Sequence, residues 1–297
     1  MKNIAVVGSG TMGNGIAHVF AQYDYKVSLI DISEEALTKA IKNIASNLDR
    51  MIAKQTITEA DKERTLSNIS THSSIKLGVQ DCDLAIEAVS ENINLKLKIF
   101  KELDEFCKHS CILASNTSSI SISQIGAVTK RGDKVIGMHF MNPVPVMKLV
   151  EVIRGYLTSD KVCTTINELS VRIGKIPCEV QDYPGFISNR VLIPMINEAI
   201  FALHERVSNV RDIDMVMRFG MNHPMGPLQL ADFIGLDVVL DILNVLHDGF
   251  KNPKYAPCPL LVNMVRAGHL GKKTGSGFYK YKDGSKDLVM ADHFRHW

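Results

Sequence analysis

His139 and Glu151 are two residues whose types and spacing are suited to acid–base chemistry. His139 follows an apolar run, KVIGM, that predicts a strand, and Glu151 lies inside a second apolar run, KLVEVI. A carboxylate in a buried strand needs a partner, because burying it alone would cost roughly several kcal/mol. Histidine is such a partner, and the pair could move a proton near neutral pH. The alternative is a core histidine that bonds a nearby carbonyl group.

The glycine-rich motif GSGTMG near the start of the chain is suited to binding a dinucleotide. It follows a strand-like run, Lys2–Val7, and precedes a segment with the apolar spacing of a helix. In that position the first glycine permits a tight turn, the second lets a pyrophosphate approach the backbone, and the third lets the helix pack on the strand. The alternative is an ordinary strand–helix turn. The candidate cofactor-binding residues of this motif are Gly8, Gly10, Thr11, Met12 and Gly13.

Asp31 ends the second strand-like run, eighteen residues after Gly13. A carboxylate at this place can accept hydrogen bonds from the adenosine ribose hydroxyls, and it would repel a 2′-phosphate. No arginine follows it directly, so the sequence favours NAD over NADP. The alternative is that Asp31 caps the following helix, although Ser33 is the more natural cap.

The elements that must position these residues alternate between strand-like and helix-like patterns as far as residue 184. This alternation predicts an α/β domain, residues 1–184, with a Rossmann-like doubly wound sheet. A long polar segment with helical spacing, Ser33–Ser70, predicts a helical arm at about residues 40–70. Beyond Pro184–Gly185 the pattern is helical apart from a short GFYKY, which predicts an all-α second domain, residues 185–297.

Composition narrows the choice of partners and compartment. The 297 residues are 45% hydrophobic with a net charge of +2, which gives no reason to expect binding to nucleic acid or a membrane. The first apolar run leads directly into the glycine motif and is too short for a signal peptide, so we expect a cytoplasmic protein. The six cysteines form no CxxC motif, although Cys107 and Cys111 are four apart. We expect reduced thiols and no bound metal.

Five segments, in chain order, resemble the L-3-hydroxyacyl-CoA dehydrogenases, and among them the bacterial 3-hydroxybutyryl-CoA dehydrogenases. The resemblance extends from Lys2 to about Tyr281. Its HFMNP…E element is specific, whereas the glycine loop is common to many dehydrogenases. The segments are VVGSGTMGNGIA, SNTSSI, GMHFMNPVPVMKLVEVI, PGFISNRV and GKKTGSGFYKY.

The resemblance implies roles for individual residues. His139 is expected to be the catalytic base and Glu151 its partner. Ser118 and Asn189 are expected to contact the substrate, with Ser118 also close to the nicotinamide. Arg50 and Lys54, in the arm, are expected to bind the CoA phosphates, although that subgroup often has lysine where this chain has Arg50. Further cofactor contacts are expected from Glu91, Lys96, Asn116, Asn142 and Lys273.

The expected function is NAD-dependent oxidation of (3S)-3-hydroxyacyl-CoA to 3-oxoacyl-CoA, and the reverse, by a homodimer that associates through the second domain. Two alternatives stay open. One is a dehydrogenase for a sugar acid such as L-gulonate on the same architecture, which would not need phosphate contacts from Arg50 and Lys54. The other is a non-catalytic NAD-binding sensor, which would not need an acid–base pair. Acyl chain length, direction and pathway do not follow from the sequence.

Overall fold

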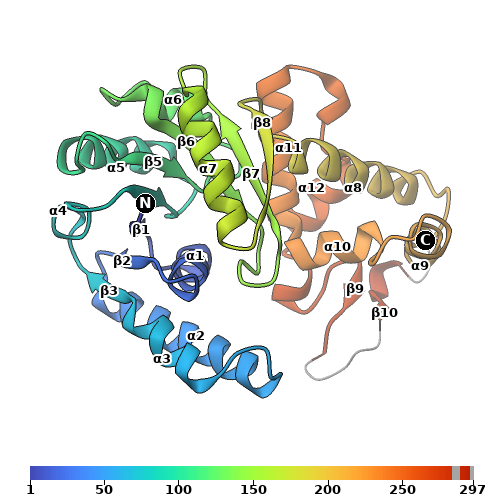
Figure 1. Ribbon diagram of the computed structural model, residues 1–297. Coiled ribbons are helices and arrows are strands. Elements are labelled where there is room, and N and C mark those ends of the chain that lie inside the picture. Colours follow the sequence, from blue (N-terminus) through green and yellow to red (C-terminus); the bar gives the residue numbers. More distant parts are fainter. Residues whose placement is uncertain (283–287, 295–297) are drawn as a thin grey trace. The chain divides into compact units, whose positions relative to one another are not determined.

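The structure, a computed structural model, describes residues 1–282 and 288–294. The chain divides into two compact units, Met1–Tyr183 and Pro184–Trp297. The predicted architecture, a doubly wound sheet followed by a helical domain, is confirmed (Figure 1). No helix of the described residues is both long enough and apolar enough to cross a membrane.

The first unit is built on an eight-stranded sheet with the strand order β3-β2-β1-β4-β5-β6-β7-β8. Neighbouring strands are parallel except that β7 runs antiparallel to β6. The central strands are continuous apolar runs, as expected for strands that are covered on both faces. The strands are β1 (Asn3–Val7), β2 (Lys26–Ile30), β3 (Ile69–His72), β4 (Leu84–Glu87), β5 (Ile112–Ser115), β6 (Val135–Phe140), β7 (Leu149–Arg154) and β8 (Ile176–Gln181).

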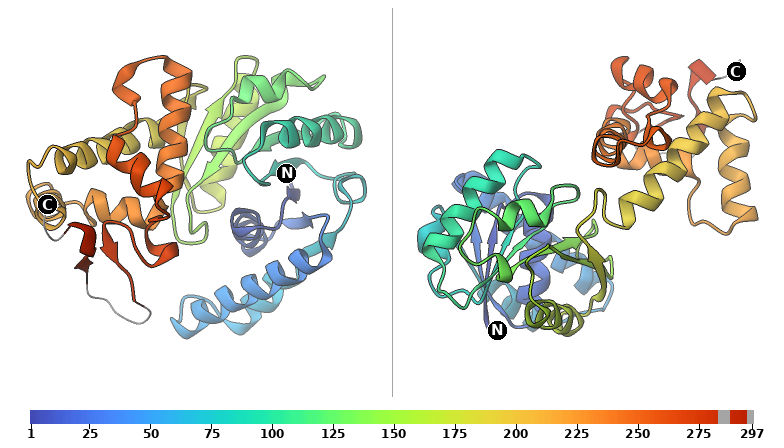
Figure 2. Two further views of the ribbon diagram at one scale, coloured as in Figure 1. Left: turned by 180° about the vertical axis from the view of Figure 1, so that it is seen from behind. Right: turned by 90° about the horizontal axis from the view of Figure 1, so that it is seen from above.

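Helices cover both faces of this sheet (Figure 2). Buried residues of α1, α2 and α7 belong to one apolar cluster with the sheet, while α5 and α6 pack together on the other side. A short 3₁₀ helix, Gly132–Lys134, precedes β6. The α-helices are α1 (Thr11–Gln22), α2 (Glu34–Ala53), α3 (Glu59–Ser67), α4 (Ile75–Gly78), α5 (Ile93–Phe106), α6 (Ile122–Gly126) and α7 (Asp160–Arg172).

The predicted arm is a pair of helices, α2 and α3. Ser33 caps α2 by accepting a hydrogen bond from Ala36 N, and Thr58 and Asp61 form a capping box at the start of α3. Buried side chains anchor α2 to the core as far as Leu48, and Met51 in its last turn packs against the same apolar cluster. The prediction of helix to Ser70 was wrong at its end, because β3 begins at Ile69 and pairs with β2.

The second unit is helical apart from two two-residue strands, β9 (Tyr279–Lys280) and β10 (Val289–Met290), which pair antiparallel. Asp232 fixes β9 by accepting hydrogen bonds from Phe278 N and Tyr279 N, both 2.9 Å long. The helices are α8 (Ser188–His204), α9 (Val210–Met215), a π-helical turn (Val216–Gly220), α10 (Pro227–Ile234), α11 (Leu236–Phe250) and α12 (Pro259–Arg266), with 3₁₀ helices at Pro253–Tyr255, Lys272–Thr274 and Asp292–Phe294.

Candidate active site

His139 and Glu151 lie opposite each other on the antiparallel strands β6 and β7. Their side chains share one face of the sheet, and His139 Nδ1 is 2.8 Å from Glu151 Oε2. Both residues are buried, with 7% and 2% of their surface exposed. An ionised carboxylate only accepts hydrogen bonds, so Nδ1 carries the proton and Nε2 is left as the acceptor. The carboxylate thereby fixes the tautomer that a general base requires.

Ser118 completes a chain of three side chains. Its Oγ lies 3.0 Å from His139 Nε2, on the side of the ring away from Glu151. Since Nε2 is the acceptor in this tautomer, the Ser118 hydroxyl donates to it. Asn116 lies in the same loop after β5, and its Oδ1 accepts a 2.9 Å hydrogen bond from Phe140 N. That bond holds the end of β6 next to His139.

The segment between β6 and β7 contains Asn142, whose side chain is exposed. Lys175, which the sequence did not indicate, binds this segment through its backbone. Its buried ammonium group donates to the backbone carbonyls of Val144 and Met147. No sequence signal points to Lys175, because its partners lie about thirty residues away and are backbone atoms.

The glycine loop has the geometry that a dinucleotide requires. Gly8 has a φ of +101°, which favours glycine, and a Cβ on Gly13 would lie 1.8 Å from Gly8 O. A Cβ on Gly10 would meet nothing within 4 Å, so the space beside it is open. Among the described residues no side chain caps α1, whose first turn contains Thr11, Met12 and Gly13. Its N–H groups are therefore available to a pyrophosphate.

Asp31 lies directly beside this loop at the end of β2. Its Oδ2 accepts hydrogen bonds from Ser9 N and Ser9 Oγ, both 2.8 Å long, and Oδ1 accepts one from Ser33 N. Partial burial would raise the pKa of the Asp31 carboxyl, but these hydrogen bonds outweigh it and hold the pKa below its usual value. Asp31 is thus a partly exposed anion, as contact with ribose hydroxyls requires, and these residues together fit NAD.

Glu91 and Lys96 belong to a polar network behind Ser118. Glu91 Oε1 accepts hydrogen bonds from Ser118 N and Ser119 N, at 3.0 and 3.1 Å, and also bonds the hydroxyl of Thr117. Lys96 is fully buried, and its ammonium lies 3.3 Å from Glu91 Oε2. Glu91 thus positions the backbone of Ser118. The cofactor contacts that the family resemblance implies for Glu91 and Lys96 stay predictions.

Glu87 is a member of this network that sequence reasoning missed. Its carboxylate binds Lys96 Nζ at 2.6 Å and the Ser115 hydroxyl at 2.7 Å. The ion pair between Glu87 and Lys96 is fully buried. The sequence carries the same signal for Glu87 as for Glu151, because Glu87 lies in an otherwise apolar strand, LAIE.

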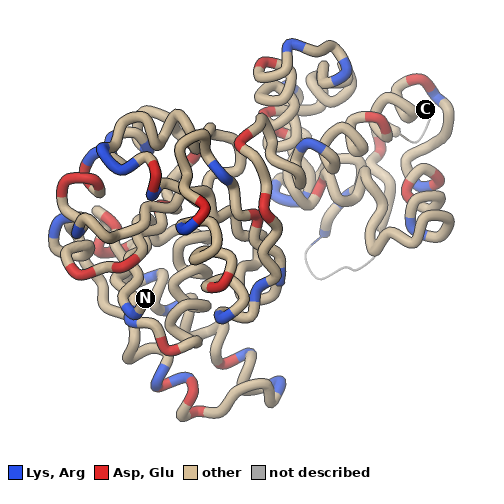
Figure 3. Tube along the Cα trace, turned by 45° about the horizontal axis from the view of Figure 1, so that its top comes forward, with Lys and Arg blue, Asp and Glu red and all other residues tan. Residues whose placement is uncertain are grey.

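The remaining candidate residues lie at the end of α2 or in the second unit. Arg50 and Lys54 are exposed at the end of α2, where Arg50 makes a 3.4 Å contact with Ser46 Oγ. Asn189 lies in the first turn of α8. Lys273 is exposed and pairs with Asp237 at 2.5 Å. Acidic and basic residues are interspersed along the chain (Figure 3), so charge alone does not single these out.

A glycine loop with an anionic ribose site, on the same sheet as a Ser–His–Glu chain, defines the class of nicotinamide-dependent dehydrogenases. Residues 3–183 match the model of the 3-hydroxyacyl-CoA dehydrogenase NAD-binding domain, and residues 185–281 match that of the C-terminal domain. The chain therefore belongs to the 3-hydroxyacyl-CoA dehydrogenase family.

Individual relatives agree with this assignment. A probable 3-hydroxybutyryl-CoA dehydrogenase of Bacillus subtilis is 50% identical over 283 residues, which cover 95% of this chain and 98% of the relative. A 3-hydroxybutyryl-CoA dehydrogenase of Clostridioides difficile is 50% identical over 278 residues, or 94% of this chain and 99% of the relative. The crystal structure of (S)-3-hydroxybutyryl-CoA dehydrogenase from Ralstonia eutropha superposes with a TM-score of 0.93 at 48% identity, covering 95% of this chain and 100% of that one.

Proposed function

We propose that this NAD-dependent dehydrogenase interconverts (3S)-3-hydroxyacyl-CoA and 3-oxoacyl-CoA, with a preference for the four-carbon pair 3-hydroxybutyryl-CoA and acetoacetyl-CoA. The observation that carries the reaction is the chain Ser118–His139–Glu151 on an NAD-binding domain. The preference for short chains rests on the relatives that are named 3-hydroxybutyryl-CoA dehydrogenases.

The chemistry follows from the acceptor at His139 Nε2. Oxidation of the 3-hydroxyl group releases a proton from oxygen and a hydride from carbon, and bound NAD⁺ supplies the acceptor for the hydride. His139 Nε2 takes the proton, and the buried Glu151 carboxylate stabilises the imidazolium that forms. Ser118 then donates its hydrogen bond to the substrate oxygen, which lies where Nε2 can reach it. In the reverse direction His139 returns the proton.

A single assay separates this proposal from the alternatives. NADH oxidation is followed with acetoacetyl-CoA, with longer 3-oxoacyl-CoAs, and with acetoacetate, which has no CoA group; NAD⁺ reduction is followed with L-gulonate. We expect the highest kcat/KM with acetoacetyl-CoA and a large loss with free acetoacetate. Turnover of L-gulonate alone would support the sugar-acid enzyme, and no turnover with intact NADH binding would support a sensor.

The other contacts rest on family resemblance. We propose that Asn142 and Asn116 lie near the nicotinamide, that Glu91 and Lys96 serve the cofactor ribose, and that Lys273 contacts the cofactor. Asn189 is the proposed substrate contact of the second unit, and Arg50 and Lys54 are the proposed phosphate contacts. We also propose a cytoplasmic location, where the six cysteines would stay reduced.

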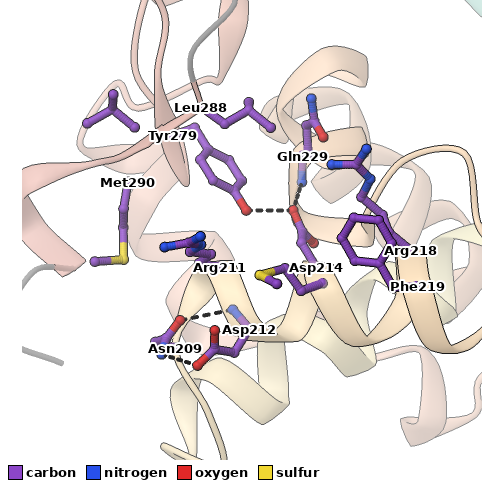
Figure 4. Close-up of a pocket in the computed structure, with 12 residues that line it drawn as sticks. Asn209, Arg211, Asp212, Asp214, Arg218, Phe219, Gln229, Tyr279, Leu288 and Met290 are labelled. Carbon is purple, nitrogen blue, oxygen red and sulfur yellow. Dashed lines mark hydrogen bonds between the residues drawn. The ribbon is translucent and has the colours of Figure 1, made fainter.

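The second unit is the proposed dimerisation domain, with a second copy of this chain as the partner. Its α9 and the following π-helical turn expose large apolar side chains, among them Val216 and Phe219, which is 72% exposed. Phe219 and Leu288 border a hollow of about 1030 Å³ (Figure 4). Asp214 in this hollow is bonded to Tyr279 Oη and to two backbone N–H groups, so its role is structural. Exposed apolar surface of this kind is typical of protein–protein interaction sites, which supports the proposed dimer.

The dimer is tested by light scattering after gel filtration. The native chain should have twice the monomer mass, and the double substitution Val216→Glu with Phe219→Glu should give a monomer that still binds NADH. Tyr156→Glu, at a still more exposed aromatic residue of the first unit, is the control and should remain dimeric. A native monomer, or a dimer that survives the double substitution, would contradict this interface.

A further inference from the structure

Three cysteines that are far apart in sequence meet inside the first unit. The ligand atoms of Cys82, Cys107 and Cys111 all lie within 4.8 Å of one another. Cys82 Sγ is 3.4 Å from Cys111 Sγ and 3.8 Å from Cys107 Sγ. All three residues are buried, with at most 5% of their surface exposed. The sequence predicts reduced thiols and no bound metal, and neither the acid–base site nor the cofactor loop uses these residues.

The fold brings the three sulfurs together at the amino edge of the sheet. Cys82 comes just before β4, and Cys111 comes just before its parallel neighbour β5. Cys107 is the C-cap residue directly after α5, and the turn back to the sheet is closed by a hydrogen bond from Cys111 N to Lys108 O. Ser118 follows the opposite, carboxyl edge of the sheet, so the cluster is a separate site from the acid–base chain.

The spacing of the sulfurs matches the ligand set of one soft metal ion. In a three-coordinate site a metal–thiolate bond of about 2.3 Å places the sulfurs about 4.0 Å apart. The observed separations of 3.4 and 3.8 Å are somewhat shorter, so modest outward movements of the side chains would admit the ion. In the described part of the chain no histidine, aspartate or glutamate joins this group as a fourth ligand. Three thiolates without a fourth ligand suit a three-coordinate ion better than tetrahedral zinc.

Positive charge near the cluster can offset part of the negative charge of thiolates. The buried Arg131 guanidinium donates to the carbonyls of Lys108 and Cys107 and pairs with Asp104 at 2.7 Å. Lys108 lies in the turn between Cys107 and Cys111 and pairs with Asp83 at 2.6 Å. Each cation also has an acidic partner, so each offsets only part of the charge of three thiolates.

We propose that Cys82, Cys107 and Cys111 form a buried three-thiolate site for a single Cu(I) ion. Binding replaces three S–H bonds by three S–Cu bonds, releases three protons to solvent and changes no oxidation state. The bound site has a net charge of −2. Soft thiolate ligands select Cu(I) among the ions that a cell offers. A disulfide between two of these residues would leave the third thiol unexplained and would need an oxidant.

The test is an anaerobic titration of the full chain with Cu(I), in competition with the chromophoric chelator bicinchoninate. All variants carry Cys178→Ser, because Cys178 is an exposed thiol that would bind copper on its own. We expect one tightly bound equivalent, lost or weakened at least tenfold by Cys82→Ala, Cys107→Ala or Cys111→Ala. Cys163→Ala removes a buried thiol from α7 and is the matched control, which should leave the stoichiometry unchanged.

X-ray absorption of the copper-loaded Cys178→Ser chain gives a second readout that needs no substitution in the cluster. A single shell of three sulfur atoms supports the site. Two sulfur atoms, a stoichiometry that the three substitutions do not change, or uptake that Cys163→Ala abolishes would overturn it. Tight binding of Zn(II) with no uptake of Cu(I) would overturn the assignment of the ion.

Discussion

His139 and Glu151 face each other directly across β6 and β7, and a 2.8 Å hydrogen bond joins their side chains. The antiparallel register puts both side chains on the same face of the sheet, twelve residues apart in sequence. The strands on either side are well anchored, since β6 pairs with β5 and β7 with β8. The dyad is therefore built on rigid backbone, which keeps the imidazole in one orientation.

The first prediction concerns this dyad. His139→Ala and Glu151→Gln should each lower kcat by about 10²–10⁴-fold, the usual contribution of positioned acid–base catalysis. The amide that replaces the Glu151 carboxylate cannot offset the charge on an imidazolium, and it can present an N–H group where the ring needs an acceptor. Stopped-flow kinetics measure kcat. Fluorescence titration measures the binding of NADH, which should be preserved.

The double substitution shows whether the two residues act together. Residues that work as a unit are strongly non-additive, so the double variant should be little worse than either single one. Glu179→Gln, at an exposed glutamate of the adjacent strand β8, is the control and should retain full turnover. Losses that multiply would mean that the hydrogen bond has no part in catalysis.

The second prediction concerns Ser118. Its Oγ is 3.0 Å from His139 Nε2, the atom proposed to take the substrate proton. Ser118→Ala should reduce kcat by about 2- to 15-fold, corresponding to one neutral hydrogen bond of about 0.5–1.5 kcal/mol. Steady-state kinetics with acetoacetyl-CoA measure it, with Ser110→Ala, an exposed serine, as the control. A loss as large as that of His139→Ala would give Ser118 a role beyond hydrogen bonding.

The third prediction concerns cofactor choice. A 2′-phosphate would meet the Asp31 carboxylate, and two like charges about 4 Å apart repel by about 1–4 kcal/mol. Asp31→Ser should therefore narrow the ratio of kcat/KM for NADH over NADPH by about tenfold or more. Glu34→Ser, at an exposed carboxylate in the first turn of α2, should leave the ratio unchanged. If the native chain prefers NADPH, this assignment of Asp31 is wrong.

The sequence predicted the parts of the fold and site that depend on local patterns. The glycine loop, Asp31 and the apolar strands have fixed spacings, so their neighbours along the chain define them. A buried carboxylate needs a partner, but the choice of His139 as the partner of Glu151 rested on the family resemblance; in the structure a hydrogen bond joins the two. The predicted end of the arm was wrong. The segment β3 is short and half polar, and it becomes a strand only by pairing with β2.

Contacts between distant parts of the chain could not be predicted in this way. Lys175 donates to carbonyls of the segment that follows β6, and Cys82 meets Cys111 across two parallel strands. Both contacts depend on which strands are neighbours, and no spacing in the sequence specifies that. Cys107 and Cys111, four residues apart, suggested one helical face, yet α5 ends before Cys107 and the two meet through a turn.

The fourth prediction concerns the end of the arm. If Arg50 and Lys54 bind CoA phosphates, Arg50→Ala with Lys54→Ala should raise KM for acetoacetyl-CoA and leave KM for NADH unchanged. These groups are remote from the reacting carbon, so most of the loss should be uniform binding, with kcat preserved. Lys39→Ala, on an earlier turn of α2, is the control. An unchanged KM, or an equal rise in the control, would make both residues part of a solvated helix face.

The last prediction concerns His18, which is fully buried in α1. Neither ring nitrogen has a hydrogen-bond partner in the described part of the chain. Burial, together with the charge of Lys175, lowers the pKa of His18 from 6.5 to about 4. Between these two values the unfolded chain binds a proton and the folded chain does not, so stability is complete above pH 6.5 and falls as the pH drops towards 4.

The size of the effect follows from the shift. Each pKa unit corresponds to about 1.36 kcal/mol, so acidification from pH 7 to pH 5 should cost about 2 kcal/mol through His18. His18→Leu keeps a similar volume and removes the titration, so its stability should fall less over this range. Urea unfolding followed by circular dichroism at both pH values measures the difference, with His109→Gln, an exposed histidine, as the control. Equal pH dependence in His18→Leu and the native chain would mean that His18 is protonated in the folded state and has a partner there.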